Sequence, residues 1–84
     1  MYYLYIVKCA DGTFYTGITT ELSRRMREHN RTAHGAKYTV ARRPVRLVFS
    51  RAFANRSRAA RAEARLKRLS RAEKKSVING KIVL

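Results

Sequence analysis

The chain has 84 residues, of which 45% are hydrophobic, and 20 Lys and Arg against 5 Asp and Glu give it a formal charge of +15. This length allows one domain, residues 1–84, with a thin core, and it excludes a second domain or a large buried cofactor. The charge exceeds what solubility needs and predicts a polyanionic partner.

Nucleic acid fits this charge better than a membrane does, because the basic residues are dispersed over the whole chain. No apolar run approaches the roughly 20 residues of a membrane span, and the first residues have the pattern of a strand instead of a signal peptide. Cys9 is the only cysteine, which excludes an intramolecular disulfide, and two histidines and one cysteine fall short of a zinc cluster. We therefore expect a cytoplasmic monomer that binds nucleic acid.

The first predicted elements are two strands that form a hairpin. Residues Tyr2–Cys9 and Thr13–Thr19 are rich in aromatic and β-branched residues, and Ala10-Asp11-Gly12 between them is a strong turn signal. Cys9 falls on the same face as the odd-numbered apolar residues of its strand, which indicates a buried small hydrophobic side chain.

The loop length decides whether two tyrosines can act together. A two-residue loop would send Tyr5 and Tyr15 to opposite faces of the sheet, whereas a three-residue loop or a bulge puts them on one face, with Tyr5 opposite Gly17. We predict the three-residue loop. A glycine inside a strand marks a close approach, and here it indicates either room for a phosphate or a plain bend.

A helix is predicted to follow. Thr19 and Thr20 offer its N-cap, Glu21 suits its positive end, and Leu22 and Met26 mark its buried stripe. The adjacent stripe carries an arginine and a histidine four residues apart, so the helix and the hairpin can direct side chains into one groove.

From residue 30 to residue 43 the periodicity fades, and Gly35 breaks any helix there. A loop this basic, with one aromatic residue, is typical of an arm that contacts phosphates. Its candidate nucleic-acid-binding residues are Lys37, Tyr38, Arg42 and Arg43.

Pro44 precedes a third predicted strand, Val45–Phe53. In this strand Val45, Leu47 and Phe49 are expected on one face, and Arg46, Val48 and Ser50 on the other.

The last part of the chain predicts two helices. Asn55 or Ser57 can cap the first, over Arg58–Leu69, and the capping box that begins at Ser70 starts a final helix, which Gly80 ends. The predicted fold is α+β, a small three-stranded and mainly antiparallel sheet flanked by helices in the order β-β-α-β-α-α.

Several of these residues form a recognisable pattern. Tyr3-Leu4-Tyr5, Tyr15-Thr16-Gly17, Arg25 and His29, at this spacing, resemble the motifs of the GIY-YIG nuclease superfamily, and the resemblance to its short stand-alone bacterial members extends over nearly the whole chain. It implies the same sheet with flanking helices and hydrolysis of DNA that depends on Mg²⁺ or Mn²⁺, in DNA repair or recombination.

The resemblance also implies roles for individual residues. One of Tyr5 and Tyr15 would deprotonate or position the attacking water, and Arg25 would steady the scissile phosphate. His29 would be an auxiliary proton acceptor, and Glu63 would bind the metal. Without the resemblance, Arg25 would be expected to pair with Glu21, and His29 would be expected to be a surface or capping side chain.

Glu63 is the one carboxylate for which the sequence suggests no architectural role. A single carboxylate with phosphate and water suits Mg²⁺, whereas the alternative, an i,i+4 pair with Lys67, is worth only about 0.3–0.5 kcal/mol. Without the resemblance, the sequence favours the metal site and the ion pair equally. Around Glu63 the predicted nucleic-acid-binding residues are Arg58, Arg61, Arg65 and Lys67.

Two other functions suit the same sequence. One is a non-catalytic basic module that binds nucleic acid on a nuclease scaffold, and the other is an RNA-binding accessory protein. For the nuclease we expect branched, nicked or single-stranded DNA as substrate, recognised by its shape and backbone.

Overall fold

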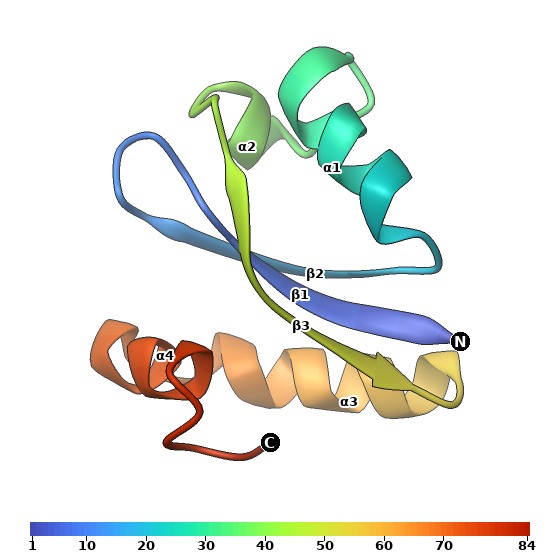
Figure 1. The fold of residues 1–84 in the computed structure, drawn as a ribbon, viewed down its shortest axis with the longest axis vertical. Helices are drawn as coiled ribbons and strands as arrows, with labels where there is room; N and C mark the ends of the chain where they lie inside the picture. The colour runs from blue at the N-terminus through green and yellow to red at the C-terminus, as the bar shows by residue number, and fades with distance from the viewer.

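The computed structural model describes all 84 residues, and a three-stranded antiparallel sheet lies at its centre (Figure 1). The elements in chain order are β1 (Tyr2–Lys8), β2 (Phe14–Thr19), α1 (Leu22–Arg31), α2 (Lys37–Val40), β3 (Arg46–Phe53), α3 (Arg56–Lys67) and α4 (Arg71–Ile78). The strand order is β2-β1-β3, and α1 and α2 lie on one side of the sheet while α3 and α4 lie on the other. The predicted α+β class is confirmed, with the short helix α2 in addition.

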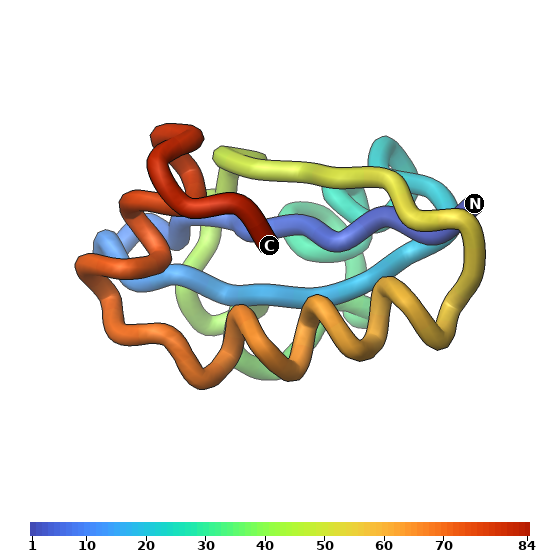
Figure 2. The backbone as a smooth tube through the Cα atoms, turned by 90° about the horizontal axis from the view of Figure 1, so that it is seen from below, coloured from blue at the N-terminus to red at the C-terminus, as the bar shows by residue number.

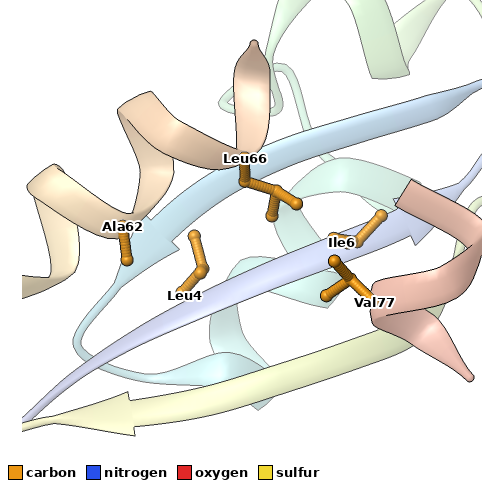
Figure 3. Packing of buried hydrophobic residues seen from close by; sticks show 5 residues of the cluster. All are labelled: Leu4, Ile6, Ala62, Leu66 and Val77. Carbon is orange, nitrogen blue, oxygen red and sulfur yellow. The ribbon is translucent and has the colours of Figure 1, made fainter. Parts of the chain in front are cut away.

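The central strand β1 is buried on both faces, which divides the core into two clusters. Leu4 and Ile6 point to α3 and α4, where they pack with Ala62, Leu66 and Val77 (Figure 3). Because alternate residues of a strand face opposite ways, the other face of β1 needs a second partner layer, and α1 and α2 supply it.

The second cluster contains Tyr5, Val7, Cys9 and Val45, against which Leu22 and Met26 of α1 pack. Cys9 is only 4% exposed, so its predicted role as a buried small hydrophobic residue is confirmed. This cluster fixes α1 over the face of the sheet from which Tyr5 projects.

The hairpin has the predicted three-residue loop. The backbone N–H of Cys9 donates to the carbonyl of Thr13 (2.8 Å), and Gly12 adopts the left-handed φ of +85° that the turn requires. Tyr5 therefore pairs with Gly17, and Tyr15 falls on the same face of the sheet as Tyr5, as predicted.

The N-cap of α1 differs from the prediction. Its cap is Glu21, whose carboxylate accepts from the backbone N–H groups of Ser23 (2.9 Å) and Arg24 (2.8 Å). A carboxylate offers two oxygens and so satisfies two helix-end donors at once. Thr19 instead accepts from the N–H of Glu21 and supports the cap from outside the helix.

The basic loop contains the one-turn helix α2, which the absence of periodicity did not predict. Gly35 precedes α2 and packs closely against α1: a Cβ at this position would lie 2.6 Å from the carbonyl oxygen of Glu28. The glycine thus permits a close approach of loop and helix.

The alternation predicted for the third strand is wrong beyond Leu47. Strand β3 pairs Leu47 with Val7 and Phe49 with Ile6, so Val48 is an extra, bulged residue. Val48 and Phe49 consequently both pack against the α3 side of the core, and Leu47 is 40% exposed.

Helix α3 begins at Arg56, two residues earlier than predicted, and ends at Lys67 instead of Leu69. Its N-cap is Asn55, which settles the choice between Asn55 and Ser57. The capping box of Ser70 and Glu73 is confirmed at the start of α4. None of the helices has the length and apolar character needed to cross a membrane.

Candidate active site

The site is built around a hydrogen-bond chain that joins β1, α1 and α2. The hydroxyl of Tyr5 lies 2.7 Å from Nε2 of His29, and Nδ1 of His29 lies 2.7 Å from the hydroxyl of Thr39. All three side chains are buried, with exposed fractions of 1%, 0% and 0%. Three segments distant in the sequence are thus tied together through one imidazole ring.

The direction of proton donation along these hydrogen bonds follows from the contact that Thr39 makes at their far end. The hydroxyl of Thr39 donates its single proton to the carbonyl of Ala36 (2.9 Å), so it can only accept from Nδ1 of His29. A neutral imidazole protonated at Nδ1 has a free lone pair on Nε2, which accepts the proton of the Tyr5 hydroxyl. Thr39 therefore fixes the tautomer in which His29 can receive a proton from Tyr5.

Burial keeps both groups neutral. Burial, with the nearby charge of Arg25, lowers the pKa of His29 to about 4. Burial also raises the pKa of Tyr5 above its ordinary value, and the charge of Arg25 opposes this rise. At neutral pH the pair is therefore a phenol that donates to an imidazole, with no charge on either group.

The position of Gly17 explains how Tyr5 fits. A Cβ at Gly17 would lie 2.5 Å from the hydroxyl oxygen of Tyr5 and 2.7 Å from the ring carbon that bears it. The space above the glycine is thus filled by the phenol. Neither a phosphate nor a bend accounts for Gly17, because its missing side chain is what admits Tyr5.

Tyr15 lies beside this chain and differs from Tyr5 in its exposure. Its ring meets the edge of the His29 ring at a centroid distance of 5.5 Å and stacks on Tyr38 at 6.0 Å. The Tyr15 side chain is half-buried, and its hydroxyl makes no hydrogen bond within the protein. Of the two motif tyrosines, Tyr15 is the one whose hydroxyl is free to meet a substrate.

Arg25 brings the cation to the site. It does not pair with Glu21; instead its Nη1 contacts the carboxylate of Glu28 at 3.0 Å and the carbonyl of His34 at 2.9 Å. The side chain is 24% exposed, which leaves part of the guanidinium accessible. Arg25 lies one turn before His29 on α1, and its charge affects the pKa of both Tyr5 and His29.

Glu63 approaches from α3, on the other side of the sheet. Figure 2 shows α3 running alongside β2, the edge strand that carries Tyr15. The negative charge of Glu63 is close enough to contribute to the raised pKa of Tyr5. The alternative pairing is also present, because Nζ of Lys67 lies 3.5 Å from the Glu63 carboxylate, with Lys67 55% exposed.

The donor set bears on which metal could bind. No group of three His, Cys, Asp or Glu side chains lies together anywhere in the structure. A single carboxylate, 22% exposed, fits Mg²⁺ or Mn²⁺, because Mg²⁺ keeps several waters and takes few protein ligands beside substrate phosphates. Zinc, which requires several nitrogen or sulfur ligands, does not fit.

The predicted residues of the basic arm divide into two kinds. Arg43 donates from Nε to the carbonyl of His29 (2.6 Å) and from Nη2 to the carbonyls of Glu28 (3.0 Å) and Thr32, at the end of α1. Most of its guanidinium is therefore occupied in capping this helix.

The other members of the arm are more open. Arg42 lies over the Tyr38 ring at 3.8 Å and pairs with Asp11 at 3.0 Å, while Lys37 is exposed. Nucleic-acid binding by these three side chains stays a prediction. The ring of Tyr38 extends the aromatic surface formed by Tyr15.

Sequence reasoning missed Thr39 and Glu28 as parts of the site and its support, and it named Arg43 only as a phosphate contact, whereas Arg43 supports the end of α1. Thr39 lies ten residues after His29 in a stretch without periodicity, so no local pattern links the two. The Arg25–Glu28 pair had a signal, since residues three apart on a helix are neighbours. The sequence therefore offered Glu28 as well as Glu21 as a partner for Arg25.

Comparisons with known proteins agree with the resemblance. The family model described as the GIY-YIG catalytic domain matches residues 1–76. A UPF0213 protein of Desulfotalea psychrophila is 49% identical over 92% of this chain and 70% of its own length. A UPF0213 protein of Halobacterium salinarum is 48% identical over 92% of this chain and 99% of its own length.

Two solved structures share the fold. The solution NMR structure of a UPF0213 protein from Bacillus halodurans superposes with a TM-score of 0.62 at 44% identity and covers 96% of this chain and 86% of its own. The solution NMR structure of a protein from E. faecalis gives a TM-score of 0.65 at 44% identity and covers 94% of this chain and 83% of its own.

Proposed function

Because this chain belongs to the GIY-YIG nuclease family, we propose that it is a divalent-metal-dependent endonuclease that hydrolyses phosphodiester bonds in DNA. The observation that carries the proposal is the buried hydrogen-bond chain Tyr5–His29–Thr39, with the ring of Tyr15 against His29 and Arg25 one turn before His29 on α1. A cation, a carboxylate and phenols at one place are the groups that phosphodiester hydrolysis requires.

The two tyrosines take different parts. Tyr15, half-buried with an unengaged hydroxyl, contacts and orients the attacking water. Tyr5 is a positioning residue: it is 1% exposed, and its proton is held toward Nε2 of His29. His29, held in one tautomer by Thr39, fixes the orientation of the Tyr5 hydroxyl and so of the aromatic face on which Tyr15 lies.

Arg25 stabilises the phosphate as negative charge grows on it. Its guanidinium is anchored on one side by Glu28, so little reorganisation is needed when the phosphate arrives. Glu63 would hold the Mg²⁺ or Mn²⁺, and when bound this cation would neutralise charge on the phosphate oxygens. Lys67 must then leave the carboxylate, which is a small cost for an exposed pair.

Substrate recognition rests on the backbone of the nucleic acid. Lys37 is exposed on the α2 arm, and Arg42 lies over the ring of Tyr38, on which an unpaired base can stack when Arg42 moves to a phosphate. Such contacts do not distinguish one base sequence from another, so the enzyme selects branched, nicked or single-stranded regions by shape. This selectivity is the basis for placing it in DNA repair or recombination.

The Glu63–Lys67 ion pair is the observation that favours the alternative, a non-catalytic module that only binds nucleic acid. In that case the carboxylate serves the helix surface and the nuclease framework remains as a scaffold. Both functions predict binding that weakens steeply with salt, so a binding assay cannot separate them.

A nicking assay separates them. The wild-type chain is incubated with forked, nicked and linear DNA, and with matched RNA, in Mg²⁺, in Mn²⁺ and in EDTA. We expect cleavage of the forked or nicked DNA with either metal and none in EDTA. Binding without cleavage under every condition would refute the nuclease, and a preference for RNA without any metal effect would support an RNA-binding protein.

A further inference from the structure

A second basic feature lies away from the candidate active site, where the start of α3 faces the end of β3. It is a groove of about 430 Å³ lined by Arg51, Arg58, Arg61 and Arg65, with Phe53 and Ala62 among its apolar lining. The strand end and the helix start are adjacent in the chain and lie close together (Figure 1).

The charges of Arg58, Arg61 and Arg65 in this groove have no partner within the protein. None of its arginines pairs with a carboxylate within 4.0 Å, since the ion pairs of this structure involve only Arg25, Arg42 and Lys67 as cations. The side chains of Arg58, Arg61 and Arg65 make no hydrogen bond, whereas Arg51 donates to an oxygen of Leu84 (2.8 Å), which also lines the groove. Like charges gathered in a hollow repel one another unless an anion lies between them.

The groove arginines and Glu63 of the candidate active site lie on opposite flanks of the same helix. Arg61 and Arg65 are each two residues from Glu63, and two residues correspond to about 200° around an α-helix. These arginines line the groove with residues at the end of β3, whereas Glu63 does not line it and pairs with Lys67 instead.

The dimensions of the arginine row indicate its ligand. Arg58 to Arg65 spans seven residues of helix, or about 10 Å at roughly 1.5 Å per residue. This exceeds one phosphate group and matches about three nucleotides of a strand, at about 3.4 Å per nucleotide along the duplex axis. Guanidinium groups bind phosphate oxygens in pairs, which suits a backbone better than a single small anion.

We propose that the groove binds the phosphate backbone of a second segment of the nucleic acid, separate from the strand that enters the active site. This inference rests on the proposed function for the identity of the first segment. The protein then holds two segments across α3, and a substrate with two arms or a bend satisfies both positions at once.

The test compares two variants with equal loss of charge. Arg58→Gln/Arg61→Gln/Arg65→Gln removes the groove cations, and Arg27→Gln/Arg31→Gln/Lys81→Gln removes exposed cations that line no pocket and form no ion pair. Fluorescence anisotropy with a forked duplex gives log Kd against log[salt] for each. Circular dichroism verifies the fold.

We expect the groove variant to reduce the salt slope by about 2–3, because each duplex phosphate contact contributes about 0.9, and the control to change it by less than one. In the nicking assay the groove variant should raise KM and keep kcat. Equal slopes for the two variants would overturn the proposal.

Single substitutions and the cleavage result keep the test decisive. If the triple variant unfolds, Arg58→Gln, Arg61→Gln and Arg65→Gln alone should each lower the slope by about one, and unchanged slopes would again overturn the groove. Failure of the wild type to cleave would refute the nuclease while leaving the slope comparison valid. Cleavage with unchanged slopes would refute the groove alone.

Discussion

The hydroxyl of Tyr5 donates to Nε2 of His29 over 2.7 Å, and neither side chain has appreciable contact with solvent. Tyr5→Phe would leave a buried imidazole acceptor without a partner, and such a group costs about 1–3 kcal/mol. We expect this loss in the free energy of unfolding measured with urea. Tyr3→Phe is the control, because the Tyr3 hydroxyl makes no hydrogen bond. Equal stability of the two variants would show that the bond contributes nothing.

The lowered pKa of His29 predicts that stability depends on pH. An ordinary histidine titrates near pH 6.5, so between pH 6.5 and about 4 the unfolded chain binds a proton that the folded protein does not. Stability is therefore full above about pH 6.5 and falls as the pH drops toward 4. A difference of about 2.5 pKa units corresponds to about 3 kcal/mol. Urea unfolding at a series of pH values measures it.

Two histidine variants test whether His29 causes this dependence of stability on pH. His29→Gln should abolish the pH dependence between about pH 4.5 and 6.5, whatever its overall stability, while the exposed His34→Gln should keep it. The lowered pKa values of Asp11, Glu28 and Glu73 cause a further loss that begins as the pH falls into the ordinary range of carboxylates and continues below it. A slope retained by His29→Gln would mean that His29 is not buried in neutral form.

Gly17→Ala should displace Tyr5. The added methyl would meet the Tyr5 hydroxyl and ring, and overpacking of this kind costs about 1–3 kcal/mol. Thermal unfolding measures the loss, and the NMR signals of the His29 ring should shift as the hydrogen bond lengthens. Gly12→Ala is a useful contrast, because its strain comes from a φ of +85° and would leave the His29 signals in place.

Arg43→Gln should weaken the protein more than it weakens DNA binding. Arg43 donates to carbonyls of His29, Glu28 and Thr32 at the end of α1, and hydrogen bonds from a charged group are worth about 1.5–3 kcal/mol each. We expect a clear drop in unfolding free energy with a salt slope for DNA binding that changes by less than one. The exposed Arg46→Gln should leave stability unchanged. A normal stability for Arg43→Gln, with a reduced slope, would make Arg43 a phosphate ligand instead.

Local patterns in the sequence predicted what local physics decides. The three-residue hairpin loop was predicted as the length that lets Tyr5 and Tyr15 act together, and the capping box of Ser70 and Glu73 needs only residues three apart. Both were confirmed because no distant contact competes with them.

Features that depend on distant contacts were missed. The bulge at Val48 arises where β3 pairs with β1, and the single-strand alternation does not reveal it. Thr39 meets His29 only because α2 packs on α1, and the open space over Gly17 was filled by a side chain from the neighbouring strand. The cap at Glu21 was missed because its carboxylate reaches two donors, where a threonine hydroxyl reaches one. The residues of the candidate site were proposed from the resemblance, and their chemical roles stay predictions.

The most direct measurement is the rate of DNA nicking in Mg²⁺ or Mn²⁺ by Glu63→Gln and Arg25→Ala, each assayed beside Glu73→Gln, a carboxylate variant on α4. Removing one group that stabilises the transition state costs about 10²–10³ in rate. We predict that loss for the first two variants, with DNA affinity retained, and wild-type nicking for Glu73→Gln. Wild-type rates for Glu63→Gln and Arg25→Ala would contradict the account.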